Sequence, residues 1–121
     1  MKIEKFEDIE TWKKARILLQ EIYSHFANVR DYSIKDQIQR ASLSIMSNIA
    51  EGFDRGSNKE FIQYLVIARG SASEVRSILF AALDIGHINL ATFNNLSEQC
   101  LILTSLINGF IRYLRNSERK R

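Results

Sequence analysis

The apolar residues between positions 57 and 85 constrain the fold more than any other feature of the sequence. They recur at alternating steps of four and three residues through three heptads, at Phe61, Leu65, Ala68, Ala72, Val75, Leu79 and Ala82. This spacing places every member on one side of an α-helix, as in helices that pack side by side. Ser57 followed by Glu60 is a capping box that predicts the helix start, and Gly86 is typical of a helix end. The segment predicts one amphipathic helix about 43 Å long, whose apolar seam other helices must cover.

Three further segments carry apolar stripes with helical spacing, and we predict helices over residues 8–28, 33–53 and 90–115. The stripes are Trp12, Ala15, Leu19, Ile22 and Phe26; then Ile34, Ile38, Ala41, Ile45, Ile49 and Phe53; then Phe93, Leu96, Cys100, Leu103, Ile107, Phe110 and Leu114. The chain has no proline and only five glycines, so it lacks the turn residues that β-rich folds need. Short connections make successive helices antiparallel. The predicted fold class is therefore all-α, an antiparallel up-down-up-down four-helix bundle, with residues 1–121 in one domain.

Several polar and glycine residues predict helix ends and helix contacts. Ser33 is expected to cap the second helix and Asn89 the last. Gly52 is expected at the exit of the second helix. Gly70 and Gly109 lie inside predicted helices, where glycine costs roughly 1 kcal/mol relative to alanine. We therefore expect each of these two to mark a close approach between helices.

The last predicted helix has more apolar residues than one buried face can hold. The surplus lies outside its stripe, at Leu101, Ile102, Leu106, Ile111 and Tyr113. A surface helix needs an apolar arc of only somewhat more than 100°. The helix is therefore either central or in contact with another subunit, and no helix is central in a four-helix bundle. We predict a subunit contact, and no membrane span, because the apolar run is short and contains Asn108 and Arg112.

The net charge of +3 is concentrated at the C-terminal end of the chain. Five cations stand there against one acid, Glu118; they are Arg112, Arg115, Arg119, Lys120 and Arg121. The simpler interpretation is a solubilising helix end, where cations also suit the negative end of the helix dipole. The alternative is contact with RNA or DNA, in which each cation neutralises a phosphate and releases counterions.

Polar residues form a second row beside the apolar stripes of the second and third helices. In chain order they are Arg40, Ser44, Asn48, Glu51, Arg69, Glu74 and Arg76. Counting outward from the turn places Arg40 opposite Glu74, which predicts an ion pair. The same count lets Arg69 reach Ser44 or Ser47. The favoured interpretation is a hydrogen-bonded network that fixes helix register, because buried charges need partners.

Two functional interpretations of this polar row stay open. A groove containing Arg40, Arg69 and Arg76 is a candidate site for phosphate or RNA. A hydrolytic site using Glu51 and Glu74 is disfavoured, because several helical turns separate the two carboxylates and they would not share one substrate atom.

The remaining reactive residues predict no cofactor, metal or catalytic centre. His25 and His87 lie at different helix ends, with no further ligand at zinc spacing. Cys100 lies on an apolar stripe and is expected to be a small core residue. No phosphate-binding or dinucleotide fingerprint is present, and no small-molecule substrate is indicated. Because no catalytic motif is found, we expect a protein that is not an enzyme. The charged N-terminus is unlike a signal peptide, so we expect a cytoplasmic location.

The sequence S-N-I-A-E-G-F at residues 47–53 and A-R-G-S at residues 68–71, with Lys59-Glu60-Phe61 between them and Glu74 after them, resembles a known bacterial family. It is the four-helix-bundle family encoded in intervening sequences of 23S rRNA genes, sometimes labelled S23 ribosomal protein. Phe6, Asp8, Trp12 and Tyr23 also fit its pattern, so the resemblance extends along essentially the whole chain. Met46 departs from it, since the family usually has proline there; the segment Asn28-Val29-Arg30 also differs, where the family often has Phe-Pro.

The resemblance implies a four-helix bundle that assembles into a ring-like homopentamer, in a family without established enzymatic activity. A similarly built accessory protein of diversity-generating retroelements is a basic pentamer that works with nucleic acid. The sequence thus predicts a non-enzymatic, self-assembling helical interaction protein, and the alternative is an oligomer that binds RNA or DNA.

Overall fold

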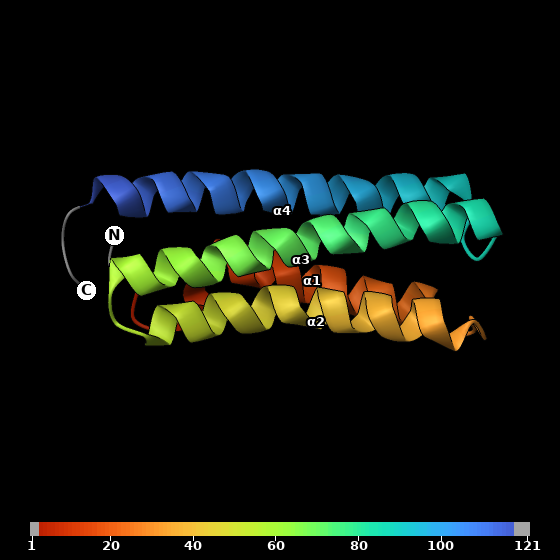
Figure 1. Cartoon of the computed structure of the whole chain (residues 1–121), viewed down its shortest axis with the longest axis horizontal. Coiled ribbons are helices and arrows are strands. Elements are labelled where there is room, and N and C mark those ends of the chain that lie inside the picture. The colour runs from red at the N-terminus through yellow and green to blue at the C-terminus, as the bar shows by residue number, and fades with distance from the viewer. Residues whose placement is uncertain (1–2, 118–121) are drawn as a thin grey trace.

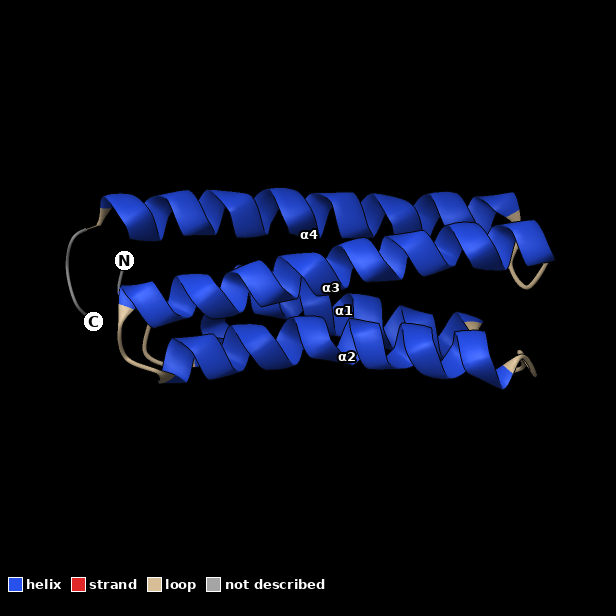
Figure 2. Cartoon of the chain, in the orientation of Figure 1, coloured by secondary structure: helices blue, strands red, loops and turns tan. Residues whose placement is uncertain are grey.

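Four long helices make up nearly all of the structure, a computed structural model that describes residues 3–117 (Figure 1). A short 3-10 turn, η1 (Phe6–Asp8), precedes α1 (Glu10–His25), α2 (Tyr32–Asp54), α3 (Asn58–Ile85) and α4 (Leu90–Asn116). Successive helices run antiparallel, and each helix packs against two others in the cyclic order α1, α2, α3, α4. Figure 2 shows only helix and connecting loop over this range. The predicted all-α up-down-up-down bundle is confirmed.

The core forms where the predicted apolar stripes meet. All seven residues of the heptad seam on α3 are buried. Ile34 and Phe53, at the two ends of the α2 stripe, are half-buried. At two other stripe positions the adjacent residue is buried in place of the predicted one. Leu18 is fully buried on α1 while Leu19 is half-buried, and Ile111 is buried on α4 while Phe110 is half-buried. Adjacent residues lie about 100° apart around a helix, so a small rotation of the helix decides which of them faces the core.

The start of α2 differs from the prediction, and the start of α3 agrees with it. The side chain of Asp31, rather than that of Ser33, caps α2 by accepting a hydrogen bond from the Ile34 amide at 3.4 Å. Ser33 already lies inside the first turn of the helix. Ser57 Oγ accepts from the Glu60 amide at 3.2 Å and donates to Glu60 Oε1 at 3.1 Å, so the capping box is confirmed.

The turn between α3 and α4 also agrees with the prediction. Gly86 ends α3 with a φ of 97°, in the left-handed region that favours glycine. Asn89 Oδ1 accepts from the Thr92 amide at 2.8 Å and caps α4. The first helix is shorter than the predicted 8–28 at both ends, since η1 and an extended Ile9 precede it and it already ends at His25.

The close approach between helices occurs at Gly52 and not at the two glycines expected to allow one. A Cβ on Gly52, which lies within α2, would be 2.6 Å from Tyr64 Cβ on α3. Nothing lies within 4 Å of the corresponding position at Gly70, and at Gly109 only Arg112 Nη2 does, at 3.8 Å. The expectations for Gly70 and Gly109 were wrong, because both positions face away from the neighbouring backbone.

The apolar surplus of α4 is divided between the core and the surface of the single chain. Ile111 is buried and Leu106 half-buried, whereas Leu101, Ile102 and Tyr113 are 45%, 43% and 61% exposed. None of the helices in residues 3–117 has a stretch long and apolar enough to cross a bilayer. Part of the surplus therefore remains at the surface.

Candidate functional site

A small polar network joins the middle of α2 to the middle of α3. Ser44 Oγ lies 2.9 Å from Ser71 Oγ across the two helices. Asn48 Nδ2 donates to the Ser44 carbonyl oxygen at 2.8 Å and to Ser44 Oγ at 3.0 Å. These groups are half-buried or buried and bonded to one another, which is the arrangement expected of a register-fixing network. Ser71 was not among the predicted residues, although it lies opposite Ser44 across the boundary between α2 and α3.

The expected ion pair between Arg40 and Glu74 does not form in this structure. Arg40 Nε donates to Asp36 Oδ2 at 2.8 Å, one turn earlier on the same helix. Glu74 Oε2 accepts from Gln37 Nε2 at 2.7 Å. A partner four residues away on the same helix face is always within reach, so it competes with a partner on another helix. The Arg40–Asp36 pair is exposed and is expected to contribute little stability.

Arg69 and Arg76 lie on the side of α3 that meets α4, and the contact of Arg69 with Ser44 or Ser47 was wrongly predicted. Arg69 Nη1 donates to Asn108 Oδ1 at 2.8 Å. Arg76 Nε donates to Ser97 Oγ at 3.3 Å. The predicted phosphate groove is therefore divided: two of its arginines bond α4, and Arg40 bonds its own helix.

Glu51 belongs to a separate cluster near the turn between α2 and α3. Arg55 Nη2 donates to Glu51 Oε2 at 2.9 Å and to the Tyr64 hydroxyl, while that hydroxyl donates to Glu51 Oε2 at 3.3 Å. The Arg55 guanidinium also lies 5.0 Å from the centre of the Tyr64 ring. The hydrogen bond to Glu51 raises the pKa of Arg55. Glu51 and Glu74 thus have different partners and do not form an acid–base pair.

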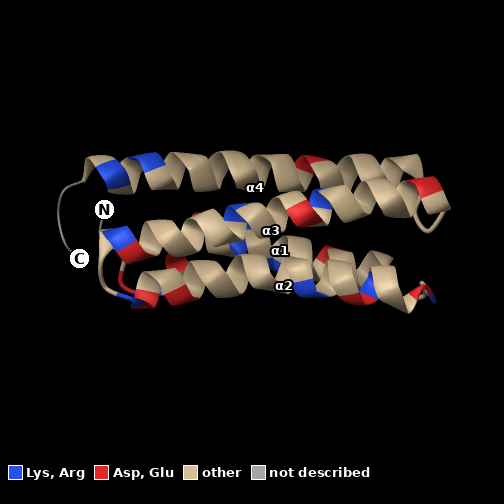
Figure 3. Cartoon of the chain, viewed as in Figure 1, with Lys and Arg blue, Asp and Glu red and all other residues tan. Residues whose placement is uncertain are grey.

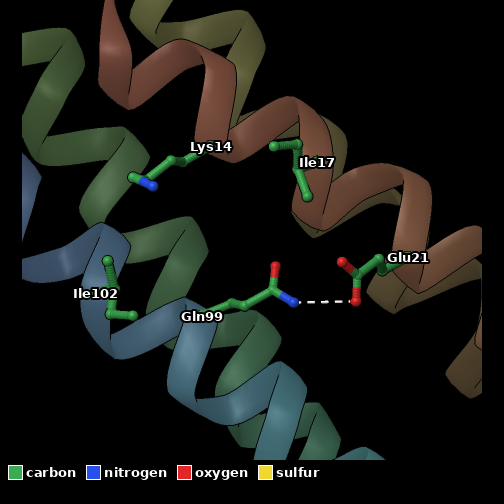
Figure 4. Close-up of a pocket in the computed structure, with 5 residues that line it drawn as sticks. All are labelled: Lys14, Ile17, Glu21, Gln99 and Ile102. Carbon is green, nitrogen blue, oxygen red and sulfur yellow. Dashed lines mark hydrogen bonds between the residues drawn. The ribbon is translucent and has the colours of Figure 1, made fainter.

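A cleft of about 190 Å³ lies between α1 and α4 (Figure 4). Its lining residues are Lys14, Ile17, Glu21, Gln99 and Ile102. Glu21 Oε1 accepts from Gln99 Nε2 at 3.0 Å, the contact drawn in Figure 4. The cleft contains one carboxylate, so it does not assemble the two that general acid and base catalysis of a hydrolysis often uses. Within residues 3–117, no three His, Cys, Asp or Glu side chains are grouped to hold a metal ion.

Cys100 is a core residue, as predicted. It is 1% exposed, and burial raises the pKa of its thiol to about 12, partly opposed by the charge of Arg76. A thiol with so high a pKa stays protonated near neutral pH and is a poor nucleophile.

The predicted basic tail lies partly within the structure. Arg112 and Arg115 are exposed on the last turns of α4. Arg119, Lys120 and Arg121 lie outside the described residues. The start of α3 lies beside this end of α4, because Asn58 Nδ2 donates to the Leu114 carbonyl oxygen at 3.3 Å.

At the opposite end of the bundle, one side-chain contact joins the two interhelical connections. His87 Nε2 lies 3.0 Å from Asp31 Oδ2, although the residues are 56 positions apart. The hydrogen bond with His87, assisted by the Ile34 amide, lowers the pKa of Asp31. Sequence patterns offered no signal for this contact, because the two residues meet only in the folded chain.

This contact predicts a loss of stability in acid. A carboxyl whose pKa is lower in the folded than in the unfolded state stabilises the fold above its unfolded pKa, and the contribution is lost as the pH falls through the folded pKa. Asp31→Asn keeps a good helix cap but removes the charge. We expect the wild type to exceed this variant in free energy of unfolding at pH 7, and the difference to shrink below about pH 4. Urea titrations at several pH values measure it.

The matched control is Asp84→Asn, at an exposed position near the same end of the bundle. It removes one negative charge from this end of the bundle without removing the contact between Asp31 and His87. An Asp31→Asn difference that is equal at pH 7 and pH 3 would contradict the prediction.

Comparison with known proteins agrees with the resemblance in the sequence. A family model described as 23S rRNA-intervening sequence protein matches residues 7–109. The fold is similar to the crystal structure of a protein of unknown function from the S23 ribosomal protein family of Bacteroides thetaiotaomicron, with a TM-score of 0.79 and 23% sequence identity. The match covers 84% of this chain and 98% of that chain, and at this identity it establishes a shared fold. A search of the curated proteins finds no significant match. Because the family model covers most of the sequence, this chain belongs to the 23S rRNA-intervening sequence protein family.

Proposed function

We propose that this protein is a non-enzymatic helical interaction module that acts as a cytoplasmic homo-oligomer, with a pentamer as the expected form. The observation that carries the proposal is the apolar surface left on α3 and α4. Val66 and Phe80 are exposed two heptads apart on α3, and Leu101 and Ile102 are exposed on the neighbouring α4. Single exposed apolar residues are ordinary, but neighbouring rows of them are typical of protein contacts.

The polar contacts support a structural role for the conspicuous side chains of the family motifs. Ser44 bonds both Asn48 and Ser71, and Glu51 bonds Arg55 and Tyr64. Groups arranged in this way hold helices in register. This use of the motif residues agrees with an assembling protein better than with a catalyst.

Sedimentation or mass photometry at micromolar concentration tests the proposal. One chain has a mass of 14.0 kDa, so a pentamer should appear at about 70 kDa. A 14.0 kDa species at every concentration up to about 100 μM would reject self-assembly.

A second candidate is binding of RNA or DNA by the basic end of the bundle. Arg112 and Arg115 are exposed on α4, and Lys59, next to Asn58 at the start of α3, lies at the same end of the bundle. Assembly would multiply this charge and raise the local potential. Fluorescence anisotropy with a labelled RNA should show affinity that falls about tenfold or more between 50 and 200 mM salt, and Arg112→Gln with Arg115→Gln should weaken it. No binding at 50 mM salt would reject this candidate.

A further inference from the structure

Helix α3 lies between α2 and α4 in Figure 3. It separates two faces of the bundle that differ in charge, the α2–α3 face and the α3–α4 face. The α2–α3 face contains Glu60, Ile67 and Glu74, which recur every seven residues on α3. Tyr64 and Ser71 lie on the same flank of α3 and bond residues of α2, so this flank points toward α2. Ile67 is 51% exposed between the two carboxylates.

The α3–α4 face contains Arg69 and Arg76 on the opposite flank of α3. These arginines bond Asn108 and Ser97, so this flank of α3 points toward α4. Leu101 on α4 lies in the row between Ser97 and Asn108 and is exposed. Arg112, four residues beyond Asn108, continues this row.

The α2–α3 face also carries Arg40 and Arg55, which are ion-paired with Asp36 and Glu51 of α2. The hydrogen bonds of the four charged α3 residues named above go to neutral partners. Glu74 bonds the amide of Gln37, and Glu60 bonds the hydroxyl of Ser57. Arg69 and Arg76 likewise bond an amide and a hydroxyl. Hydrogen bonds to neutral groups orient a charge without cancelling it. With the two ion pairs of α2 neutralised, the remaining charges named above are acidic beside Ile67 on the α2–α3 face and basic beside Leu101 on the α3–α4 face.

From this complementarity we infer that the α2–α3 face of one copy binds the α3–α4 face of the next copy. The inference rests on the proposed self-assembly and assigns the two surfaces that make it. Glu74 and Glu60 would meet arginines of the neighbouring copy, and Ile67 would pack near its Leu101. Pairing either face with itself would bring like charges together, which is costly at an interface.

The positions of the two faces suit a closed ring. Each helix packs against two others, so the bundle has four sides, and the two faces are adjacent sides that share α3. Head-to-tail contacts close into a ring when the contact faces of one copy point 180° − 360°/n apart, which is about 90° for four copies and about 108° for five. Adjacent sides of a four-helix bundle point about 90° apart, whereas opposite sides would produce an open filament.

Two variants with exchanged charge test the inference. The first combines Ile67→Arg with Glu74→Arg on the α2–α3 face, and the second combines Leu101→Glu with Arg76→Glu on the α3–α4 face. Each variant alone should assemble at least about 100-fold more weakly than the wild type, because like charges then meet at the contact. In an equimolar mixture the two variants should associate again as alternating copies, since each altered face then finds a complementary one. A ring of five cannot alternate throughout, so the expected products are mixed species of two or four copies rather than a pentamer. Sedimentation velocity measures both results.

Ile17→Arg is the matched control, because Ile17 is similarly exposed but lies on α1. It should assemble as the wild type does. Circular dichroism checks that each variant is folded. A double variant that does not fold is replaced by a single substitution at an exposed position of the same face, Glu74→Arg or Arg112→Glu.

A monomeric wild type would reject the proposed self-assembly itself. An assembled wild type whose two face variants also stay assembled would leave self-assembly standing and overturn the inference. A mixture of two monomeric variants that forms no mixed species would overturn it as well.

Discussion

Gly52→Ala is expected to lower the free energy of unfolding by about 3 kcal/mol, through overpacking between α2 and α3. The added Cβ would lie 2.6 Å from Tyr64 Cβ and 3.0 Å from Phe61 Cδ1. A Cβ is fixed to its backbone, so the Tyr64 contact is relieved only if the two helices move apart. That movement would also disturb the bond between Ser44 and Ser71 farther along the same boundary.

Gly70→Ala is the matched control for this prediction. Gly70 is also helical, but nothing lies within 4 Å of its added Cβ. Alanine in an unobstructed helix position should raise stability by about 0.5–1 kcal/mol, because it reduces the entropy of the unfolded chain. Urea unfolding at one protein concentration compares the two variants. Changes of the same sign would show that the helix contact at Gly52 is looser than the structure places it.

Phe61→Ala is expected to cost about 4 kcal/mol, mainly through the cavity that it leaves. Phe61 is 1% exposed, at the point where α2, α3 and α4 meet. Its ring centre lies 6.1 Å from that of Phe53 and 5.0 Å from that of Phe110, both in edge-to-face contact. Three helices share this contact, so the surrounding structure cannot collapse around the missing ring without moving all of them.

Phe80→Ala provides the comparison for the same change of side chain. Phe80 contacts Phe93 at a ring-centre distance of 4.7 Å but is 45% exposed. Its removal should cost about 1 kcal/mol, because much of the ring is already in water and no closed cavity forms. Thermal or urea unfolding at a fixed, low protein concentration measures both values. Equal losses for Phe61 and Phe80 would contradict the assigned core.

The helices were largely predictable because the signals for them are local. Side chains seven residues apart lie on one helix face whatever the rest of the chain does, so the row from Phe61 to Ala82 predicted a buried seam that the structure contains. Ser57, Gly86 and Asn89 predicted helix ends through contacts within one turn. The cap of α2 was wrongly assigned because Asp31 and Ser33 are both good capping residues two positions apart.

The polar contacts were less predictable, because long side chains at a helix flank can reach several partners. Arg40 was expected to reach Glu74 and bonds Asp36 instead. Arg69 was expected to reach α2 and bonds Asn108 on α4. An arginine side chain is long and flexible, so a modest rotation of a helix changes the hydrogen-bond partner of the guanidinium without changing the apolar seam.

The sequence by itself therefore determined the number of helices, their order and most of the residues that line the core, because the period of an α-helix converts local spacing into a buried side. The tertiary structure decided which helices approach most closely, at Gly52 rather than at Gly70, and which flank of α3 presents each sign of charge. It also brought Asp31 to His87 across 56 residues. These features depend on the rotation and separation of packed helices, which no pattern within a single helix specifies.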